Sequence, residues 1–300
     1  LGPHRGPALL HHAQGHDLPS AHQAYGDTGV VIYSNSVLGA RSNFEGGPSA
    51  LAAALTGRAP RYGLHLDEHR RATHRFRVTA RPRDLAEWGA LGAVIGRRAG
   101  SYWAVPVIEG IEDPPGSDAL KHMGAAMASY GSIPLFHVVG LTPEAPTLDA
   151  VGGAALTAAT ITPDDLCDFF GEYGAPGETV DIVVFSAPQL SLVEMQQVAA
   201  LLDGRRVHPE TTLLAVTSPA VGADADRMGL TERIEAAGAL VLRGMCFYQS
   251  YAREMAEANG WRRLLTNSAK LVNILGGYGY APSLASMEAC VDAAVRGRTA

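Results

Sequence analysis

The sequence predicts an α/β protein whose largely parallel sheets are covered by helices on both faces. Short apolar runs, long enough for buried strands, alternate with amphipathic segments along most of the chain, and the connections between them are short. Of the 300 residues, 47% are hydrophobic and 18% are charged, which is typical of a chain that buries a large core. This length allows one large domain or two ordinary ones.

An irregular N-terminal arm is expected over residues 1–24, and a folded core over residues 25–300. The predicted strands are 29–33, 74–80, 102–108, 133–139, 180–185, 212–216 and 240–242. The predicted helices are 48–55, 82–98, 117–130, 164–173, 191–202, 223–236 and 283–296. Glycines cluster within 150–178, so we expect a division into sub-domains, if the core has one, to fall there.

Local signals support several of the helix boundaries. Pro82 suits the start of a helix, and apolar residues recur at helical spacing from Leu85 to Ile95. Ser191 and Glu194 have the capping-box spacing, in which each side chain satisfies a backbone N–H group that the first helical turn leaves unpaired.

Charge and composition exclude several classes of partner. The net charge is −6, so the chain has no basic excess with which to displace counterions from a nucleic acid. No apolar run approaches the length of a membrane-spanning helix and no signal-peptide pattern opens the sequence, which predicts a cytoplasmic protein. The cysteines form no CxxC pair, so no local zinc motif is present; they are Cys167, Cys246 and Cys290.

A polar loop over residues 33–47 is the first candidate ligand site. It follows the predicted strand 29–33, and open α/β folds bind ligands at the carboxyl ends of strands. Arg41 offers a planar fork for a carboxylate or phosphate, and glycines let a ligand approach the backbone. The alternative is an ordinary connection between a strand and a helix. The candidate residues of this loop are Asn35, Ser36, Arg41, Asn43 and Glu45.

The turn Thr266-Asn267-Ser268-Ala269-Lys270 is the second candidate. It follows an apolar segment and contains one of only two lysines in the chain. A lysine shifts its pKa more readily than an arginine, and a serine beside it can act as a base or donate a hydrogen bond to a developing enolate. The alternative is a helix N-terminus capped by Thr266 or Asn267, with an exposed lysine.

A metal site is a further alternative at residues 62–70. If this segment is a strand, His65, Asp67 and His69 share one face and could bind a metal. A strand at the edge of a sheet with one face exposed to solvent would show the same pattern. The histidines of the N-terminal arm fit no standard ligand spacing. The sequence contains no P-loop, no GxGxxG motif in an early βαβ unit and no GxSxG motif.

On its motifs the sequence resembles the large-subunit catalytic domain of aconitase X. The likeness covers about residues 20–300 and is most specific in two segments, Asn-Ser-Val-Leu-Gly-Ala-Arg at 35–41 and Thr-Asn-Ser-Ala-Lys at 266–270. Further landmarks agree in order; they are residues 55–60, 62–65, 186–191 and 244–246.

The resemblance implies an aconitase-type α/β/α fold that works with a small swivelling domain, often a separate subunit. Members of the family dehydrate small hydroxy acids such as cis-3-hydroxyproline or phosphomevalonate. They use an iron–sulfur cluster, held by three cysteines, as the Lewis acid for the leaving hydroxyl, while a protein base removes the adjacent proton. The resemblance also implies that the loop 35–47 faces residues 266–270 in one pocket.

The sequence departs from the family where the cluster should bind. Ala187 takes the place of a cysteine and Gln189 that of a histidine, and in a loose alignment Pro7 takes the place of the N-terminal cysteine. Only Cys246 is retained, and one thiolate cannot hold an iron–sulfur cluster. We therefore expect that the family's cluster is lost and that no other cofactor replaces it.

The leading hypothesis is a cofactor-independent lyase, isomerase or cyclase in specialised biosynthesis, acting by proton transfer and oxyanion stabilisation on a small polar or carboxylate-bearing substrate. The catalytic candidates are Ser268, Lys270 and Ser36. The substrate-binding candidates are Asn35, Arg41, Asn43, Glu45, His65, Asn267 and Cys246.

Two alternatives remain open. The first is a metal-dependent hydroxy-acid dehydratase of the aconitase X type, with a different metal or with ligands from a partner subunit. The second is a non-catalytic subunit that binds a ligand or stabilises a partner. In each case a small swivelling-domain subunit is a candidate partner, and neither a nucleic acid nor a membrane is expected.

Overall fold

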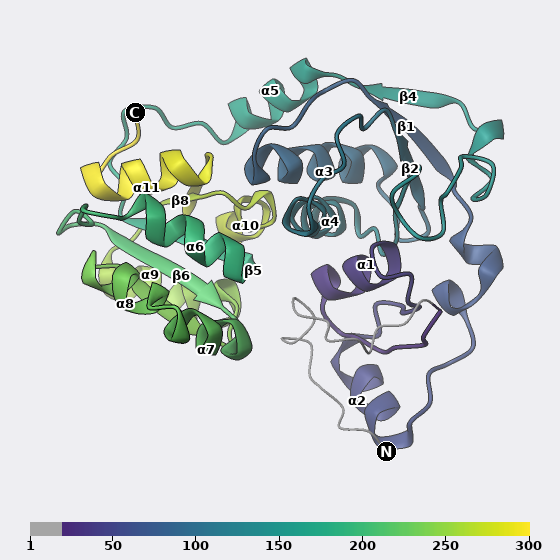
Figure 1. The fold of residues 1–300 in the computed structure, drawn as a ribbon, viewed down its shortest axis with the longest axis horizontal. Coiled ribbons are helices and arrows are strands. Elements are labelled where there is room, and N and C mark those ends of the chain that lie inside the picture. Colours follow the sequence, from purple (N-terminus) through teal and green to yellow (C-terminus); the bar gives the residue numbers. More distant parts are fainter. Residues whose placement is uncertain (1–19) are drawn as a thin grey trace. The chain divides into compact units, whose positions relative to one another are not determined.

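The computed structural model describes residues 20–300, which form two compact units, each with its own parallel sheet (Figure 1). The first unit contains the described residues up to Arg83 together with Trp88–Cys167, and the second contains Asp84–Glu87 together with Asp168–Ala300. The α/β class predicted from the sequence is therefore confirmed. Most of the arm predicted over 1–24 lies outside the described residues.

The first unit is built on a four-stranded sheet with the strand order β3-β2-β1-β4. All neighbouring strands are parallel, and Phe76 of β1 lies between Ile108 of β2 and Ala159 of β4. The strands are β1 (His74–Val78), β2 (Pro106–Glu109), β3 (His137–Val138) and β4 (Ala158–Ile161). The helices are α1 (Thr28–Ser36), α2 (Gly46–Thr56), α3 (Leu85–Ala99), α4 (Ser117–Gly131) and α5 (Pro163–Glu172); α3 and α5 cross the boundary between the units.

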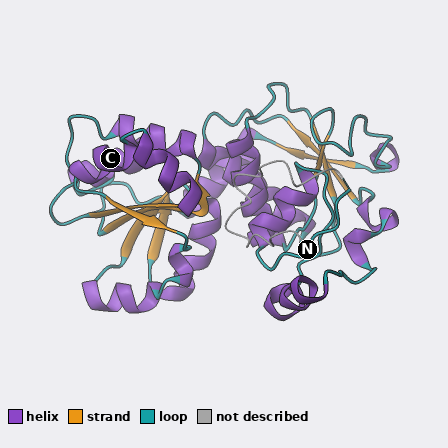
Figure 2. Ribbon diagram, turned by 60° about the horizontal axis from the view of Figure 1, so that its bottom comes forward, coloured by secondary structure: helices purple, strands orange, loops and turns teal. Residues whose placement is uncertain are grey.

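The second unit is built on a five-stranded parallel sheet with the order β7-β6-β5-β8-β9 and helices on both faces (Figure 2). The strands are β5 (Ile182–Leu190), β6 (Thr212–Thr217), β7 (Leu240–Arg243), β8 (Arg263–Thr266) and β9 (Ala281–Leu284). The helices are α6 (Leu192–Leu201), α7 (Pro219–Arg227), α8 (Leu230–Ala236), α9 (Ala252–Asn259), α10 (Ala269–Leu275) and α11 (Met287–Arg296).

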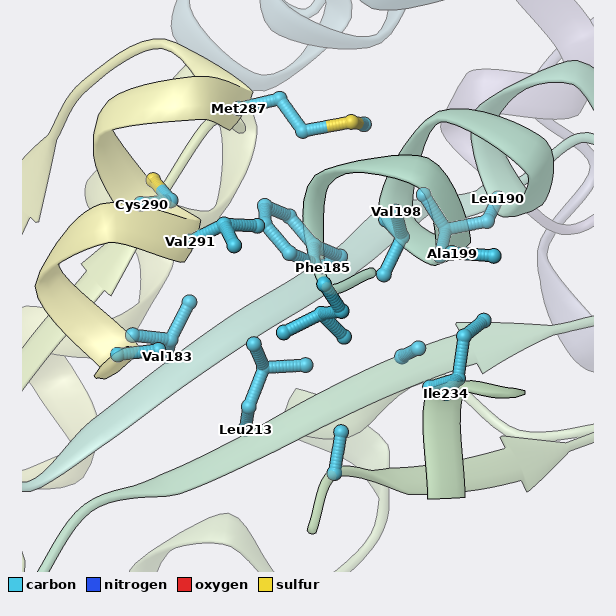
Figure 3. Packing of buried hydrophobic residues seen from close by; sticks show 14 of the residues in the cluster. Val183, Phe185, Leu190, Val198, Ala199, Leu213, Ile234, Met287, Cys290 and Val291 are labelled. Atoms are coloured by element: carbon cyan, nitrogen blue, oxygen red, sulfur yellow. The ribbon is translucent and has the colours of Figure 1, made fainter. Parts of the chain in front are cut away.

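Strand β5 lies at the centre of the second unit, and every residue in it is buried. Its side chains alternate between two cores: Val183 and Phe185 pack against α6, α7, α8 and α11 (Figure 3), whereas Ile182 and Val184 pack on the side of α9 and α10. A central parallel strand that is covered on both faces needs such a continuous apolar run. The predicted strand 180–185 is thus confirmed, with a longer carboxyl end.

The predicted strand over 29–33 is wrong, because these residues belong to α1. The Asp27 side chain caps this helix by accepting a hydrogen bond from the Val30 N–H group at 3.1 Å. The apolar residues Val30 to Ile32 are buried, and α1 packs along α4. A short apolar run cannot be distinguished from a buried helix by periodicity alone. The polar loop after α1 therefore follows a helix, and the strand-end argument does not apply to it.

Two further expectations need correction. Residues 62–70 are not a strand but contain two short 3₁₀ helices, η2 (Gly63–His65) and η3 (Asp67–Arg70). The predicted helix 223–236 is two helices, α7 and α8, separated at Gly229, whose φ of +67° interrupts the helix. The elements β4, β8, α9, α10 and β9 are not among the predicted strands and helices. The other predicted elements are present with shifted ends. Within residues 20–300, no helix is both long enough and apolar enough to cross a membrane.

Glycines allow α3 and α4 to pack with their backbones almost in contact. A Cβ atom on Gly92 would lie 2.0 Å from the Met123 carbonyl oxygen, and one on Gly131 would lie 2.3 Å from the Gly96 carbonyl oxygen. Real side-chain carbons do not approach that closely, so any larger residue must push the two helices apart.

We predict that Gly92→Ala lowers the thermal midpoint of the first unit. Overpacking of this kind costs about 1–3 kcal/mol, and in a domain of this size about 2–4 °C is lost per kcal/mol. Gly171→Ala is the matched control, because Gly171 lies in α5 with open space around its Cβ position. Differential scanning calorimetry should show a lower midpoint for Gly92→Ala only; equal midpoints for the two variants would contradict this packing.

Candidate functional site

The second predicted site lies at the point in the second sheet where the strand order reverses. The chain proceeds from β5 to β6 and β7 on one side of β5, and to β8 and β9 on the other side. Ligands of open parallel sheets bind beyond the carboxyl ends of the strands at such a point. The carboxyl ends of β5 and β8 lead into residues 186–190 and 266–270, which are the segments that carry the family resemblance.

Ser268 connects these two strand ends. Its hydroxyl group donates a hydrogen bond to the Ala187 carbonyl oxygen at 2.7 Å and accepts one from the Leu271 N–H group at 3.2 Å, so it is the N-cap of α10. Thr266 donates to the Val184 carbonyl oxygen at 2.6 Å. The predicted capping of a helix at this turn is present, but the capping residue is Ser268 rather than Thr266 or Asn267.

Asn267 and Lys270 are buried beside this cap. The side-chain nitrogen of Asn267 has no hydrogen-bond partner within residues 20–300, although the residue is only 1% exposed. A buried donor of this kind is costly unless a ligand or water satisfies it. The Lys270 ammonium group lies 5.9 Å from the centre of the Tyr248 ring. Lys270 is 5% exposed, so the alternative of an exposed lysine is wrong.

The end of β5 has a strained backbone. Ala187 has a φ of +49°, which is unusual for a residue with a Cβ atom and which costs about 1–2 kcal/mol. Next to it, the Ser186 hydroxyl accepts a hydrogen bond from the Phe247 N–H group at 3.3 Å and lies 3.8 Å from the Cys246 sulfur. The Gln189 side chain donates to the Met245 carbonyl oxygen at 2.8 Å. Strain that the surroundings maintain is common at binding sites.

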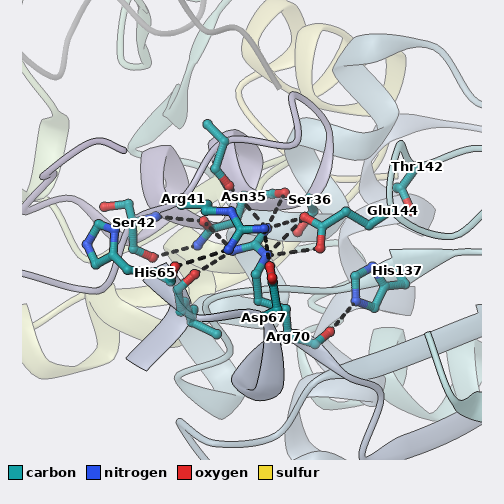
Figure 4. A network of polar contacts seen from close by, with 12 residues as sticks. Asn35, Ser36, Arg41, Ser42, His65, Asp67, Arg70, His137, Thr142 and Glu144 are labelled. Atoms are coloured by element: carbon teal, nitrogen blue, oxygen red, sulfur yellow. Dashed lines mark hydrogen bonds and ion pairs between the residues drawn. The ribbon is translucent and has the colours of Figure 1, made fainter. Parts of the chain in front are cut away.

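The first predicted site lies in the first unit and is organised by Arg70, which is 3% exposed (Figure 4). The nitrogens of its guanidinium group all donate hydrogen bonds. The acceptors are the Glu144 carboxylate, the Asn35 side-chain and backbone oxygens, and the carbonyl oxygens of Ala40 and Leu64. Arg70 could not be identified from the sequence, because its partners are distant along the chain and nothing in its local pattern distinguishes it from an exposed arginine.

Three residues predicted to bind or transform substrate hold the loop in place. The Asn35 side chain donates to the carbonyl oxygens of Ser42 and Pro134, both at 2.8 Å. The Ser36 hydroxyl accepts from the Phe136 N–H group at 2.9 Å. The Asn43 side chain accepts from the Leu64 N–H group at 2.8 Å and donates to Glu45. These bonds give each side chain a structural role; their proposed roles toward substrate stay predictions.

Arg41 and His65 lie on the outer side of this network. Arg41 donates to the His65 carbonyl oxygen at 3.0 Å and forms an ion pair with Asp67, whose pKa it lowers by hydrogen bonding and charge. The His65 ring is buried, and this burial lowers its pKa. One ring nitrogen lies 2.8 Å from the His22 ring and the other lies 3.5 Å from the Glu45 carboxylate. His22 was not singled out in the sequence, where it belongs to the predicted arm.

The described residues offer no obvious metal site. Because residues 62–70 are not a strand, His65, Asp67 and His69 do not share a strand face, and no group of three His, Cys, Asp or Glu side chains within 20–300 could bind a metal ion. The thiols do not converge: Cys246 packs on the α9–α10 side of the second sheet, and Cys290 lies in the core on the opposite face. Cys167 is exposed on α5. An iron–sulfur cluster held by three cysteines of this chain does not fit this arrangement.

Models of the aconitase X family match the chain in three successive parts. The first-domain model matches residues 16–68, the second-domain model 72–170 and the third-domain model 180–296. The boundary between the second and third domains agrees with the division between the two units. The predicted loop 35–47 and the turn 266–270 therefore belong to different domains, and the expectation that they face each other stays a prediction.

Named relatives agree with the family match. The phosphomevalonate dehydratase large subunit of Methanothermobacter thermautotrophicus is 38% identical over 92% of this chain and 64% of its own length. The cis-3-hydroxy-L-proline dehydratase of Pseudomonas aeruginosa is 37% identical over 92% of this chain and 48% of its own length. The crystal structure of Thermococcus kodakaraensis aconitase X in its holo-form aligns with a TM-score of 0.84 at 34% identity, over 92% of this chain and 69% of that chain. The chain thus spans about half to two thirds of these curated relatives.

We predict that Arg70→Lys destabilises the first unit by about 3 kcal/mol, because an ammonium group cannot satisfy the Glu144 carboxylate and the carbonyl oxygens at once. Arg58→Lys is the matched control, because Arg58 is exposed. Urea unfolding followed by circular dichroism should show a lower midpoint for Arg70→Lys and an unchanged one for Arg58→Lys. A loss below about 0.5 kcal/mol, the range of ordinary surface substitutions, would contradict the role given to Arg70.

Proposed function

Because the chain belongs to the aconitase X family, we propose that it is a lyase that removes water from a small hydroxy acid. The relatives named above are dehydratases that act on phosphomevalonate or cis-3-hydroxy-L-proline. The observation that carries the proposal is the buried side-chain nitrogen of Asn267, which has no hydrogen-bond partner within residues 20–300 and lies next to Ser268 in the chain, at the reversal point of the second sheet. A buried N–H donor at this position is suited to bind a carboxylate or a developing oxyanion.

The roles of the individual side chains follow from their chemistry. We assign the Asn267 amide to a substrate carboxylate oxygen, which would satisfy the donor that the protein leaves unpaired. The Lys270 amine would remove the proton next to the carboxylate, and Ser268 would donate to the enolate oxygen by turning its hydrogen away from Ala187. The remaining requirement is a proton donor or Lewis acid for the departing hydroxyl group.

The cofactor of this reaction is a separate question. The family resemblance implies an iron–sulfur cluster that would assist the departure of the hydroxyl group, but Cys246 and Cys290 lie on opposite faces of the second sheet, so three cysteines of this chain do not meet at one point. This arrangement favours a second candidate function, a cofactor-independent isomerase or cyclase that uses the same proton-transfer residues. In both cases we propose that the chain works with a smaller partner polypeptide, because several relatives are named large subunits.

We predict that Lys270→Arg abolishes turnover, since an arginine cannot act as a base at neutral pH. General base catalysis contributes about 10²–10⁴-fold, so kcat should fall by about that factor. Lys121→Arg is the matched control: Lys121 is also 5% exposed and pairs with Asp118 at 3.0 Å, a contact that an arginine can keep. The assay would follow water elimination from phosphomevalonate and cis-3-hydroxy-L-proline, with and without the partner polypeptide.

Iron analysis of the purified chain separates the two candidate functions. We expect iron well below one atom per chain after anaerobic purification, and no change in Cys246→Ser. Stoichiometric iron that disappears in Cys246→Ser would refute the cofactor-independent candidate and leave the dehydratase proposal intact.

A further inference from the structure

Three titratable side chains form a continuous line from the interior of the first unit to its surface. Glu45 and His65 are the inner members, with side chains 1% and 2% exposed, and His22 is exposed. The Glu45 carboxylate oxygen lies 3.5 Å from Nε2 of His65, and Nδ1 of His65 lies 2.8 Å from Nδ1 of His22. The two imidazole planes are inclined by only 26°. None of the steps proposed above uses this line of groups.

The positions of the hydrogens follow from the donors and acceptors available. A carboxylate only accepts hydrogen bonds, so Glu45 favours the His65 tautomer that carries its hydrogen on Nε2. Burial lowers the pKa of His65 and so favours its neutral form, in which Nδ1 is an acceptor. The hydrogen between the two rings then belongs to Nδ1 of His22, and Nε2 is the ring nitrogen of His22 that can accept a proton.

The surroundings hold this arrangement in place. The other groups on Glu45 are the Ser49 hydroxyl, which donates at 2.9 Å, and the Asn43 amide, which donates at 3.3 Å. Arg70 disfavours a charged His65, and Arg41 binds the His65 carbonyl oxygen while paired with Asp67. Nε2 of His65 has no hydrogen-bond partner within standard distance among residues 20–300. Catalytic hydrogen bonds are often this long before a ligand binds, and they shorten in the complex.

We propose that His22 is a proton-transfer residue, with His65 and Glu45 as the positioning residues that fix its tautomer. In the forward step, Nε2 of His22 accepts a proton from an X–H group of a bound ligand, where X is the oxygen or carbon of a hydroxy acid. The X–H bond breaks, its electron pair stays on X, and an N–H bond forms on His22. The imidazolium keeps its Nδ1–H bond to His65, and the buried Glu45 carboxylate stabilises the positive charge. The reverse step returns the proton.

The tautomer of His22 tests the proposal in the unmodified protein. Two-dimensional ¹H–¹⁵N correlation spectra of the histidine side chains at neutral to mildly alkaline pH should show His22 with its hydrogen on Nδ1 and His65 with its hydrogen on Nε2. A His22 ring with its hydrogen on Nε2 would overturn the proposal. This experiment requires neither a variant nor any lyase activity, so its outcome is independent of the proposed function.

Chemical reactivity tests the role of the buried carboxylate. Diethyl pyrocarbonate should modify Nε2 of His22 several-fold faster than it modifies His69, which is exposed on the same unit. In Glu45→Gln this excess rate should disappear, because the amide no longer selects one His65 tautomer. Equal rates for His22 in both proteins would overturn the positioning role. If Glu45→Gln does not fold, His65→Phe, which removes the acceptor facing His22, provides the same comparison.

Discussion

The second unit depends on one constraint: its parallel sheet is covered by helices on both faces, so polar groups remain only at the ends of its strands. In the second unit the nine residues of β5 are all buried, and the sheet provides its polar chemistry only where β5 and β8 end. In the first unit the polar loop is attached instead to the segment that precedes β3. Asn35 donates a hydrogen bond to the Pro134 carbonyl oxygen, and Ser36 accepts one from the Phe136 N–H group. The two candidate sites therefore arise at different places relative to their sheets.

The parts of the fold that local sequence decides could be predicted. The Ser191–Glu194 capping box, for example, depends on four consecutive residues and is present with both of its hydrogen bonds. The interpretation of residues 29–33 as a strand was wrong because burial against α4, a non-local contact, decides their conformation. The same limit explains why Arg70 was missed: its acceptors on residues 35, 40 and 144 become neighbours only after folding.

The sequence could name candidate residues but not the hydrogen bonds that these residues make. The family resemblance singled out the segments 35–43 and 266–270, which lie in the parts of the chain matched by the first-domain and third-domain models. It could not show that Asn35 and Ser36 bind backbone groups, that Ser268 caps α10, or that the side-chain nitrogen of Asn267 has no hydrogen-bond partner in the described part of the chain. Such distinctions depend on which hydrogen bonds each side chain has already made, and these bonds join residues that lie up to about a hundred positions apart.

The bond between Ser268 and Ala187 has a consequence for ligand selection. The same hydroxyl group holds the end of β5 against α10, so a ligand that recruits its hydrogen must replace a bond the protein already has. An internal hydrogen bond contributes about 1 kcal/mol to the stability of the folded protein. Because the ligand must break this bond, its binding free energy is less favourable by the same amount unless it offers a stronger acceptor. A neutral carbonyl oxygen would gain nothing from the exchange, whereas an anionic oxygen forms the stronger bond. At Ser268 a ligand with an anionic oxygen would therefore be favoured over one with a neutral carbonyl group.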